Sequence, residues 1–322
     1  MINRLIGIIK VMLNMLRDMD WEYIFSYCFL RLKHKRKEDR NRALRHSKLA
    51  FIERRFAHIL RKYRGQEFKS AANNGPIWVC WLQGENSMPP IVKLCYERLK
   101  KMSPPGRKVV LLHQQNLSDY VQIPEYIIQK LNRGLISKTH FSDILRFALL
   151  AEHGGVWIDS TIYTYNPISE SIFNQEYYSI REDNYEEYIG VNRCLWKCFL
   201  LGAAKNSPWF CCARDIIYEY WKDMNYFIDY LLVDYILLSI YDCCDSVRNK
   251  VSQDVEYAPY VLELEKLLNA PYDAHQMQQM SDACNWFKLS YKLTFNEYTE
   301  DKRLTYYGWL FQSMVEKGKH TT

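Results

Sequence analysis

The sequence has no apolar run long enough to cross a bilayer, no tandem repeat and no low-complexity tract. A transmembrane helix needs about 20 consecutive apolar residues, whereas charged side chains interrupt the apolar start of the chain at Arg4, Lys10 and Arg17. This start also lacks the compact apolar core and small-residue cleavage site of a secretory signal. We therefore expect neither a membrane-spanning segment nor a cleaved leader.

The ten cysteines have none of the spacings that are typical of zinc sites. Most of them lie in apolar or aromatic runs, and no secretory signal precedes them. This usage predicts buried thiols in the reducing environment of the cytoplasm. With 48% apolar and 15% aromatic residues among 322, the chain has enough apolar surface for one large core or two unequal ones.

Positive charge is scarce outside the first 69 residues. Those residues hold 18 Lys and Arg against 7 Asp and Glu, a balance of +11, so the remaining 253 residues carry −5 of the total of +6. A protein that binds a nucleic-acid backbone needs clustered Lys and Arg on its working face. The acidic remainder therefore predicts that nucleic acid is not a partner.

Residues 1–70 are expected to form a basic amphipathic helical extension. Near the start, apolar side chains fill one arc of a helical wheel, with the charged ones opposite. The run RLKHKRKEDRNRALRHSK at residues 31–48 then concentrates cations, which favours contact with anionic lipid headgroups. One interpretation places residues 1–64 on the inner face of the plasma membrane. The other is that they form helices packed on the following domain with a solvated basic face.

Residues 71–322 read as an α/β domain with a mainly parallel sheet. A turn-rich cluster at 71–76 separates it from the extension, and it continues with a strand at 77–81, a helix at 91–102, a strand at 108–113 and a helix at 126–131. Strands that alternate with helices are typical of parallel sheets. Ligands of such sheets bind beyond the carboxyl ends of the strands, so the turn after Trp81 is a candidate binding edge.

The segment THFSDILRFALLAEHGGVWIDST carries the strongest chemical signal. Its helix, 141–150, is apolar on nearly every face except at Asp143 and Arg146, which are three residues apart and therefore neighbours. Buried charge stabilises a fold poorly, which favours a functional pair over a structural one. Gly154 and Gly155 end the helix, and Asp159 follows the short strand 156–158 at the edge where substrates bind.

These residues resemble a known family. The Ser-Asp-x-x-Arg helix followed by Gly-Gly and Asp-Ser-Thr is similar to the donor-binding core of the DXD-containing sugar-binding glycosyltransferase group. From about residue 77 to 292 the chain more closely resembles the bacterial capsular polysaccharide synthesis protein family, through IWVCWLQGENSMPP, the segment above, FLLGAAKNSPWF and FIDYLLVDYILL. The resemblance implies a GT-A-like single nucleotide-sugar-binding domain, with a donor-binding core at 77–165 and a helical, acceptor-binding part at 166–322.

The resemblance also implies an activity, namely transfer of a sugar from a nucleotide-sugar donor, in particular a UDP-sugar, with retention of configuration. The acceptor would be a growing or lipid-linked surface polysaccharide. In an alternative reading, the chain is a catalytically inactive scaffold of the same assembly pathway. We favour the enzyme, because a decayed site has no reason to keep buried charge.

Donor-binding roles follow from the resemblance position by position. Trp81 is expected to stack on the uracil base, with Trp78 as a competing candidate. Asp143 and Arg146 are expected to hold the ribose, the donor sugar and the diphosphate, while Ser160 lies within the same donor-binding segment. Chemistry agrees, since a fixed cation stabilises a leaving diphosphate and carboxylates accept hydrogen bonds from sugar hydroxyls.

Catalytic and metal-binding roles are expected at two further positions. Asp159 matches the first Asp of the DXD pair, and Thr161 stands where the second Asp ordinarily binds Mn²⁺ or Mg²⁺. A neutral hydroxyl is a poorer ligand for a hard cation than a carboxylate, which weakens the case for the metal ion. Asp234, in an apolar helix with Asp229, is a second catalytic candidate, with pairing to a remote cation as its structural alternative.

Overall fold

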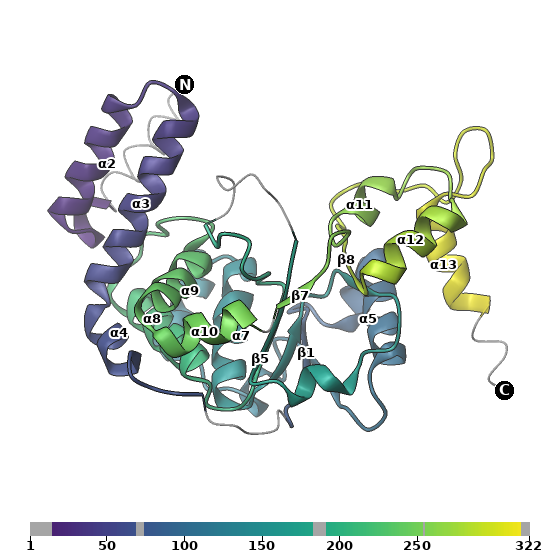
Figure 1. Cartoon of the computed structure of the whole chain (residues 1–322), viewed down its shortest axis with the longest axis horizontal. Helices are drawn as coiled ribbons and strands as arrows, with labels where there is room; N and C mark the ends of the chain where they lie inside the picture. Colours follow the sequence, from purple (N-terminus) through teal and green to yellow (C-terminus); the bar gives the residue numbers. More distant parts are fainter. Residues whose placement is uncertain (1–14, 69–73, 183–190, 254, 317–322) are drawn as a thin grey trace.

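The computed structural model describes residues 15–68, 74–182, 191–253 and 255–316. Its centre is a six-stranded sheet in the order β2-β1-β3-β6-β5-β7 (Figure 1). The strands are β1 (Ile77–Cys80), β2 (Val109–Leu112), β3 (Gly155–Ile158), β5 (Tyr177–Arg181), β6 (Leu200–Ala203) and β7 (Val255–Tyr257). Only β6 in this sheet runs antiparallel to both its neighbours, so the predicted mainly parallel α/β sheet is confirmed.

The first half of the sheet follows the predicted alternation of strands and helices. Helix α5 (Pro90–Met102) connects β1 to β2, and α6 (Glu125–Asn132) and α7 (Lys138–Glu152) connect β2 to β3. Pro90 occupies the first helical position of α5, where its missing N–H and fixed φ are harmless. Because β1 pairs in parallel with both β2 and β3, their carboxyl ends meet at one edge of the sheet.

The sheet separates two apolar cores. On β1 and β3, the side chains of Trp78 and Trp157 lie in one core, and those of Val79 and Ile158 in the other, as the period of two in a strand requires. Helix α7 and three further helices belong to the first core: α8 (Pro208–Asp223), α9 (Leu232–Cys243) and α10 (Asp245–Gln253). The second core contains α5, the strand pair β4 (Ile162–Thr164) and β8 (Trp286–Lys288), and the helices α11 (Glu263–Leu267), α12 (Ala274–Ala283) and α13 (Tyr306–Glu316).

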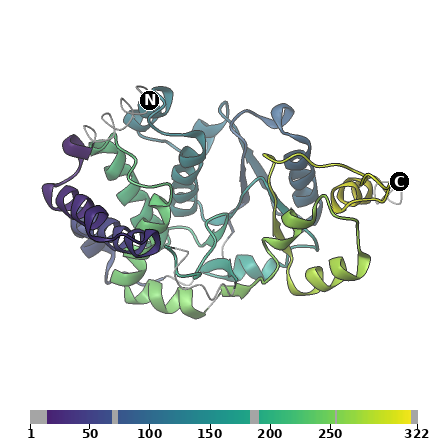
Figure 2. The same cartoon turned by 90° about the horizontal axis from the view of Figure 1, so that it is seen from above.

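The extension before the sheet is helical, as predicted, and its described part is packed on the domain. It consists of α2 (Trp21–Lys33), α3 (Lys37–Arg55) and α4 (Ala57–Tyr63). Phe51 and Phe56 join the same apolar core as α8 and α9, and ion pairs such as Arg55–Asp223 and Lys62–Asp215 join the basic extension to the acidic domain. In Figures 1 and 2, α3 lies between α2 and the domain, so α2 forms the outer margin of the molecule.

Two predicted features of the extension lie outside the described residues. The boundary between residues 70 and 71 falls within 69–73, and most of the apolar arc between residues 2 and 16 precedes residue 15. Among the residues that the structure does describe, no helix is both long and apolar enough to cross a membrane. The ten cysteines are all free thiols, and four of them are fully buried, at positions 95, 212, 244 and 284.

The prediction of a helical part from residue 166 onward needs correction. Strands β5, β6 and β7 all come from this part and complete half of the central sheet. They are runs of three to five residues, and periodicity does not distinguish such short apolar runs from helix. Asp229 also lies before α9 rather than within it. Its carboxylate accepts a hydrogen bond from the Leu231 N–H and pairs with Lys48.

Candidate functional site

A cavity of about 400 Å³ lies where β1 and β3 end, at the edge that the sequence indicates. Four of the predicted residues line its wall, from the turn after β1 and the turn after β3: Trp81, Asp159, Ser160 and Thr161. Asp143, Arg146 and Asp234 do not line it; Arg146 and Asp234 are buried, and Asp143 is half-buried. The predicted site residues therefore divide into a wall that a ligand can touch and a layer behind it.

The backbone before Asp159 is held in place by two glycines. Gly154 and Gly155 have φ values of +67° and +96°, in the left-handed region that favours glycine. A Cβ atom on Gly155 would lie 2.2 Å from the Pro76 carbonyl oxygen, because the chain between α7 and β3 runs directly against the start of β1. This close contact fixes the register of β1 and β3 and thereby positions Asp159 beside the turn that carries Trp81.

Asp159 is the centre of a cluster of four charges. Its Oδ1 accepts a hydrogen bond from Arg146 Nη2 at 3.0 Å, and its Oδ2 accepts one from Lys288 Nζ at 2.7 Å. Arg146 Nη1 donates to Asp143 Oδ1 at 2.7 Å, so the ion pair predicted on α7 is present. The Trp157 indole N–H adds a further hydrogen bond to Asp159 Oδ1 at 2.9 Å.

The electrostatics of this cluster keep Asp159 ionised. Burial disfavours its charged form, but the cations of Lys288 and Arg146 outweigh that effect and hold the pKa of Asp159 below its ordinary value. Burial likewise disfavours the charged form of Arg146, whose pKa is nevertheless raised by Asp143 and Asp159. Since only 4% of the Arg146 side chain is exposed against 27% of Asp159, Arg146 acts on the cavity through Asp159.

Sequence reasoning missed Lys288. It lies on β8, 129 residues after Asp159, and reaches the site because β8 pairs with β4 so that Lys288 is opposite Ile162. The three-residue strand WFK has no local pattern that indicates a binding residue. Only the pairing of β8 with β4, two segments far apart along the chain, brings Lys288 to the site.

A second buried contact continues the cluster away from the cavity. The Trp221 indole N–H donates to His140 Nε2 at 2.9 Å, which leaves the proton of a neutral imidazole on Nδ1. That nitrogen lies 3.5 Å from Asp143 Oδ2. His140 and Asp143 are three residues apart on α7, and both face inward. Among the described residues no hydrogen bond joins His140 Nδ1 to Asp143, so the two side chains lie close together without His140 holding the carboxylate in place.

Asp234 is buried on α9 behind the charged cluster. Its Oδ1 accepts hydrogen bonds from the Trp196 indole N–H at 3.0 Å and from Cys198 Sγ at 3.3 Å. Burial raises its pKa, although both of these hydrogen bonds oppose the change. The structure thus places Asp234 near the cluster electrostatically but away from the cavity wall, and no cation pairs with it among the described residues.

The two tryptophan candidates for base stacking lie at different ends of β1. Trp81 lines the cavity, donates to Ser87 Oγ at 3.1 Å, and packs edge-on against Tyr291 with ring centres 5.3 Å apart. Trp78 is buried, and its indole N–H donates to the Gly154 carbonyl at 2.8 Å. Of these two tryptophans, Trp81 is therefore the one that lines the cavity.

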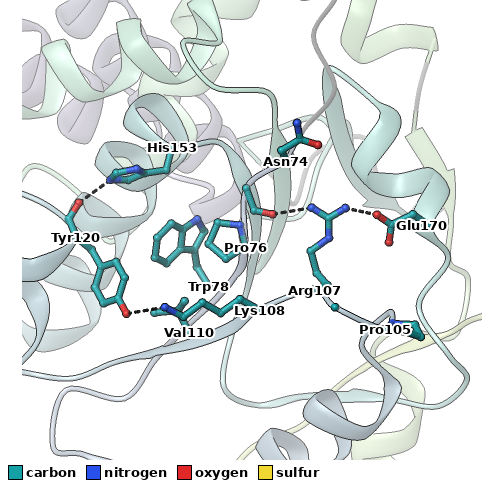
Figure 3. Close-up of a pocket in the computed structure, with 12 residues that line it drawn as sticks. Asn74, Pro76, Trp78, Pro105, Arg107, Lys108, Val110, Tyr120, His153 and Glu170 are labelled. Carbon is teal, nitrogen blue, oxygen red and sulfur yellow. Dashed lines mark hydrogen bonds and ion pairs between the residues drawn. The ribbon is translucent and has the colours of Figure 1, made fainter.

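Trp78 instead borders a cavity of about 540 Å³ at the opposite end of the strands (Figure 3). Its charged and polar groups are paired with one another: Arg107 bridges the Gly75 carbonyl and Glu170, and the His153 ring meets the Tyr120 carbonyl. Figure 3 shows the contacts of Arg107 on one side of Trp78 and the contact between His153 and Tyr120 on the other. The charged groups Arg107 and Glu170 of this second cavity are therefore engaged with each other.

The residues present do not fit a tightly bound divalent cation. Mg²⁺ and Ca²⁺ take six or more oxygen ligands, usually including carboxylates. Both oxygens of Asp159 already carry hydrogen bonds from cations, and Thr161 contributes only a hydroxyl. Within the described ranges there is no group of three or more His, Cys, Asp or Glu suited to hold a metal. The expectation of a metal ion at Asp159 and Thr161 thus lacks a suitable ligand set.

Together, the fold and the site define an α/β protein with a charged cavity at the carboxyl ends of its parallel strands. The family model described as capsular polysaccharide synthesis protein matches residues 29–310, and the chain belongs to this family. No curated protein matches the chain significantly. Solved structures that match include one titled "PaToxG Glycosyltransferase", which is 14% identical, covers 65% of this chain and 80% of its own, and superposes with a TM-score of 0.37.

Proposed function

We propose that this protein is a glycosyltransferase that transfers a sugar from a nucleotide-sugar donor, in particular a UDP-sugar, to a growing or lipid-linked capsular polysaccharide. The observation that carries the proposal is the Asp159 carboxylate, held ionised between Lys288 and Arg146 on the wall of the cavity beyond β1 and β3. Family membership supports the pathway, and the position at the carboxyl edge of parallel strands supports nucleotide binding.

In the proposed reaction, the bond between the anomeric carbon and the diphosphate oxygen breaks, and a bond from the anomeric carbon to an acceptor hydroxyl oxygen forms. The nucleoside diphosphate leaves with the bonding electron pair, and its leaving oxygen takes up the proton that the acceptor hydroxyl loses. Trp81 offers a ring on which the base stacks, and Asp159 accepts hydrogen bonds from ribose or sugar hydroxyls. Asp143 and Arg146 position Asp159 from behind. A GT-A-like fold and retention of configuration are part of the proposal.

The test combines binding with turnover. A panel of nucleotide sugars is screened for thermal stabilisation, because a ligand that binds the native state raises its melting temperature, and donor hydrolysis is then measured. Asp159→Asn is expected to keep the fold but to lower turnover at least about 100-fold, because the charged contact between Asp159 and the donor is removed. Binding without turnover by the native protein would favour the scaffold alternative, and no binding by any donor would contradict the proposal.

We also propose that the extension attaches the protein peripherally to an anionic membrane, at the inner face of the plasma membrane where lipid-linked acceptors are made. Helix α2 carries an apolar stripe with a helical spacing that the domain leaves uncovered. It consists of Trp21, Phe25, Phe29 and Leu32, which are 75%, 74%, 50% and 83% exposed.

The charge beside this stripe indicates what covers it. Five of the seven residues in RLKHKRK, 31–37, are Lys or Arg, and all five are exposed. An aromatic stripe with cations at its end matches the anionic surface of a bilayer, where each basic residue contributes about 1 kcal/mol. A protein partner would need a complementary acidic face, whereas a bilayer with anionic headgroups satisfies both features.

Cosedimentation of the full chain with phosphatidylglycerol vesicles tests this attachment. The native protein should bind at low salt and be released as salt rises, whereas the Trp21→Ser, Phe25→Ser variant should bind at least about 10-fold more weakly. The matched control is Leu293→Ser, which removes an apolar side chain that is 57% exposed elsewhere. Equal binding by all three proteins, or no binding by the native chain, would refute the attachment through α2.

A further inference from the structure

Lys288 lies beside the position where a second metal-binding carboxylate is expected. Strand β4 begins directly after Thr161, and Ile162 is the cross-strand partner of Lys288. The Leu289 N–H also donates to the Thr161 carbonyl at 2.9 Å. The pairing of β4 with β8 therefore brings a cationic side chain to the place where a metal ion would otherwise sit, and its ammonium reaches Asp159 Oδ2 at 2.7 Å.

The cluster leaves no favourable place for a divalent cation. Asp159 Oδ1 accepts two hydrogen bonds, from Arg146 and from the Trp157 indole, and Oδ2 accepts one from Lys288. A metal ion on Asp159 would have to displace Lys288 and would then lie close to the displaced ammonium. Repulsion between the two cations adds to the loss of an ion pair in which the Lys288 and Asp159 side chains are only 25% and 27% exposed.

Lys288 has donors to spare for a ligand. An ammonium group has three N–H donors, and within the described part of the chain only Asp159 accepts a hydrogen bond from Lys288. Lys138 and Lys292 stand on the same cavity wall and are exposed. The wall thus carries three lysines against two carboxylates, Asp159 and Glu265, an excess of one positive charge facing the cavity.

We propose that the cavity binds the diphosphate of a nucleotide sugar without a divalent cation, and that Lys288 supplies the positive charge that a metal ion would supply. The inference rests on the proposed glycosyltransferase function and names the group that neutralises its leaving diphosphate. Asp159 holds the Lys288 ammonium at the wall, and the remaining N–H groups donate to phosphate oxygens. When the sugar–phosphate bond breaks, the charge that develops on the leaving oxygen is stabilised by this fixed cation.

The experiment measures binding of nucleoside diphosphates to the full chain by calorimetry, with UDP as the first probe and GDP, ADP and CDP beside it. Each titration is run with a chelator and again with Mn²⁺, and uridine serves as the ligand without phosphates. UDP should bind with the same affinity, within about twofold, in both conditions. Lys288→Gln should weaken UDP binding by about 10- to 100-fold, the range for a lost charged hydrogen bond, and leave uridine binding unchanged.

Two further variants separate ligand binding from structure. Lys288→Arg keeps the charge and should retain most of the UDP affinity. The matched control Lys205→Gln removes an exposed lysine that lies past the end of β6, beside Gly154 at the opposite edge of the sheet, and should bind UDP as the native protein does. Thermal melts of the variants without ligand show whether each one is folded.

The outcomes distinguish the two proposals. If UDP binds only with Mn²⁺, or if folded Lys288→Gln binds UDP as tightly as the native chain, the diphosphate is held in another way and the inference is wrong while nucleotide binding stands. If none of the four diphosphates binds in either condition, the proposed function fails together with the inference. An equal loss of UDP and uridine affinity in Lys288→Gln would show that the lysine only supports the fold of the cavity.

Discussion

Replacing Arg146 with methionine tests whether the cluster around Asp159 is a single electrostatic unit. Arg146 contacts two carboxylates, Asp143 at 2.7 Å and Asp159 at 3.0 Å, and 4% of its side chain is exposed. Methionine fills much of the same volume without a charge, so the main effect of Arg146→Met is to leave both carboxylates without this cation. Breaking a buried ion pair in this way typically costs about 3–5 kcal/mol.

The expected cost lies near the lower end of that range, at about 3 kcal/mol, because Asp159 keeps a second cation and neither carboxylate is fully buried. Asp159 retains Lys288, and 15% of the Asp143 side chain and 27% of the Asp159 side chain are exposed to solvent. The unfolding entropy of a chain of 322 residues is about 0.7 kcal/mol/K, from about 2 cal/mol/K per residue. A loss of about 3 kcal/mol therefore lowers the melting temperature by about 4 °C.

The pH dependence of the stability loss in Arg146→Met tests whether the loss comes from the charge on Asp159. Burial opposes ionisation of Asp159, but Lys288 and Arg146 lower its pKa, so its ionised form adds stability above the unfolded pKa of about 3.9. This contribution is lost as the pH falls through the folded pKa. The difference between native protein and Arg146→Met should be full at neutral pH and shrink as the pH falls through the folded pKa of Asp159, which lies below its ordinary value.

Thermal melts of both proteins from neutral to acid pH provide the measurement, with Arg98→Met as the matched control. Arg98 is also buried, at 5% exposure, but it donates to the carbonyls of Thr164 and Tyr165, which do not titrate. Its replacement should cost stability that does not vary with pH. If the cost of Arg146→Met is equally independent of pH, or if it is below about 1 kcal/mol, the electrostatic account of the cluster is refuted.

Two further predictions concern residues around the site. Burial raises the pKa of Asp234, so the contribution of this group to the free energy of unfolding is present below the unfolded pKa and is lost as the pH rises through the folded pKa. Asp234→Asn should therefore raise the melting temperature at neutral pH and leave it unchanged in acid. A lower melting temperature of the variant at neutral pH would contradict this. Gly155→Ala would place a Cβ atom 2.2 Å from the Pro76 carbonyl oxygen and should prevent folding to a soluble protein, whereas Gly134→Ala, at φ +72° in open space, should cost only about 1–2 kcal/mol in a denaturant melt.

The part of the fold that could be predicted from sequence is the part with strong local signals. Strands β1, β2 and β3 and helices α5 and α7 lie within a few residues of their predicted positions, because each is bounded by proline, by glycine or by a change in apolar period. The ion pair of Asp143 and Arg146 was also predictable from local sequence, because residues three apart on a helix are neighbours.

The strands β5 and β6 could not be predicted in this way. Tyr177–Arg181 and Leu200–Ala203 are short runs with buried side chains on both faces, so they lack the alternation that marks a half-buried strand. Their conformation follows from the sheet itself, because β6 pairs with β3 on one side and with β5 on the other. Local sequence does not specify such partners, which are distant along the chain.

The roles that we propose for Arg146 and Lys288 differ from the roles that the motif alone implies. The sequence places Arg146 beside Asp143 and assigns it to the diphosphate, yet the fold buries Arg146 behind Asp159 and brings Lys288 to the wall from β8. A buried guanidinium orients a carboxylate well but does not reach the phosphates of a ligand in the cavity. A lysine with 25% of its side chain exposed keeps its charge near the cavity and has a flexible stem. Substitution of Arg146 should therefore lower turnover because Asp159 loses its position. Substitution of Lys288 should weaken binding of the phosphates directly.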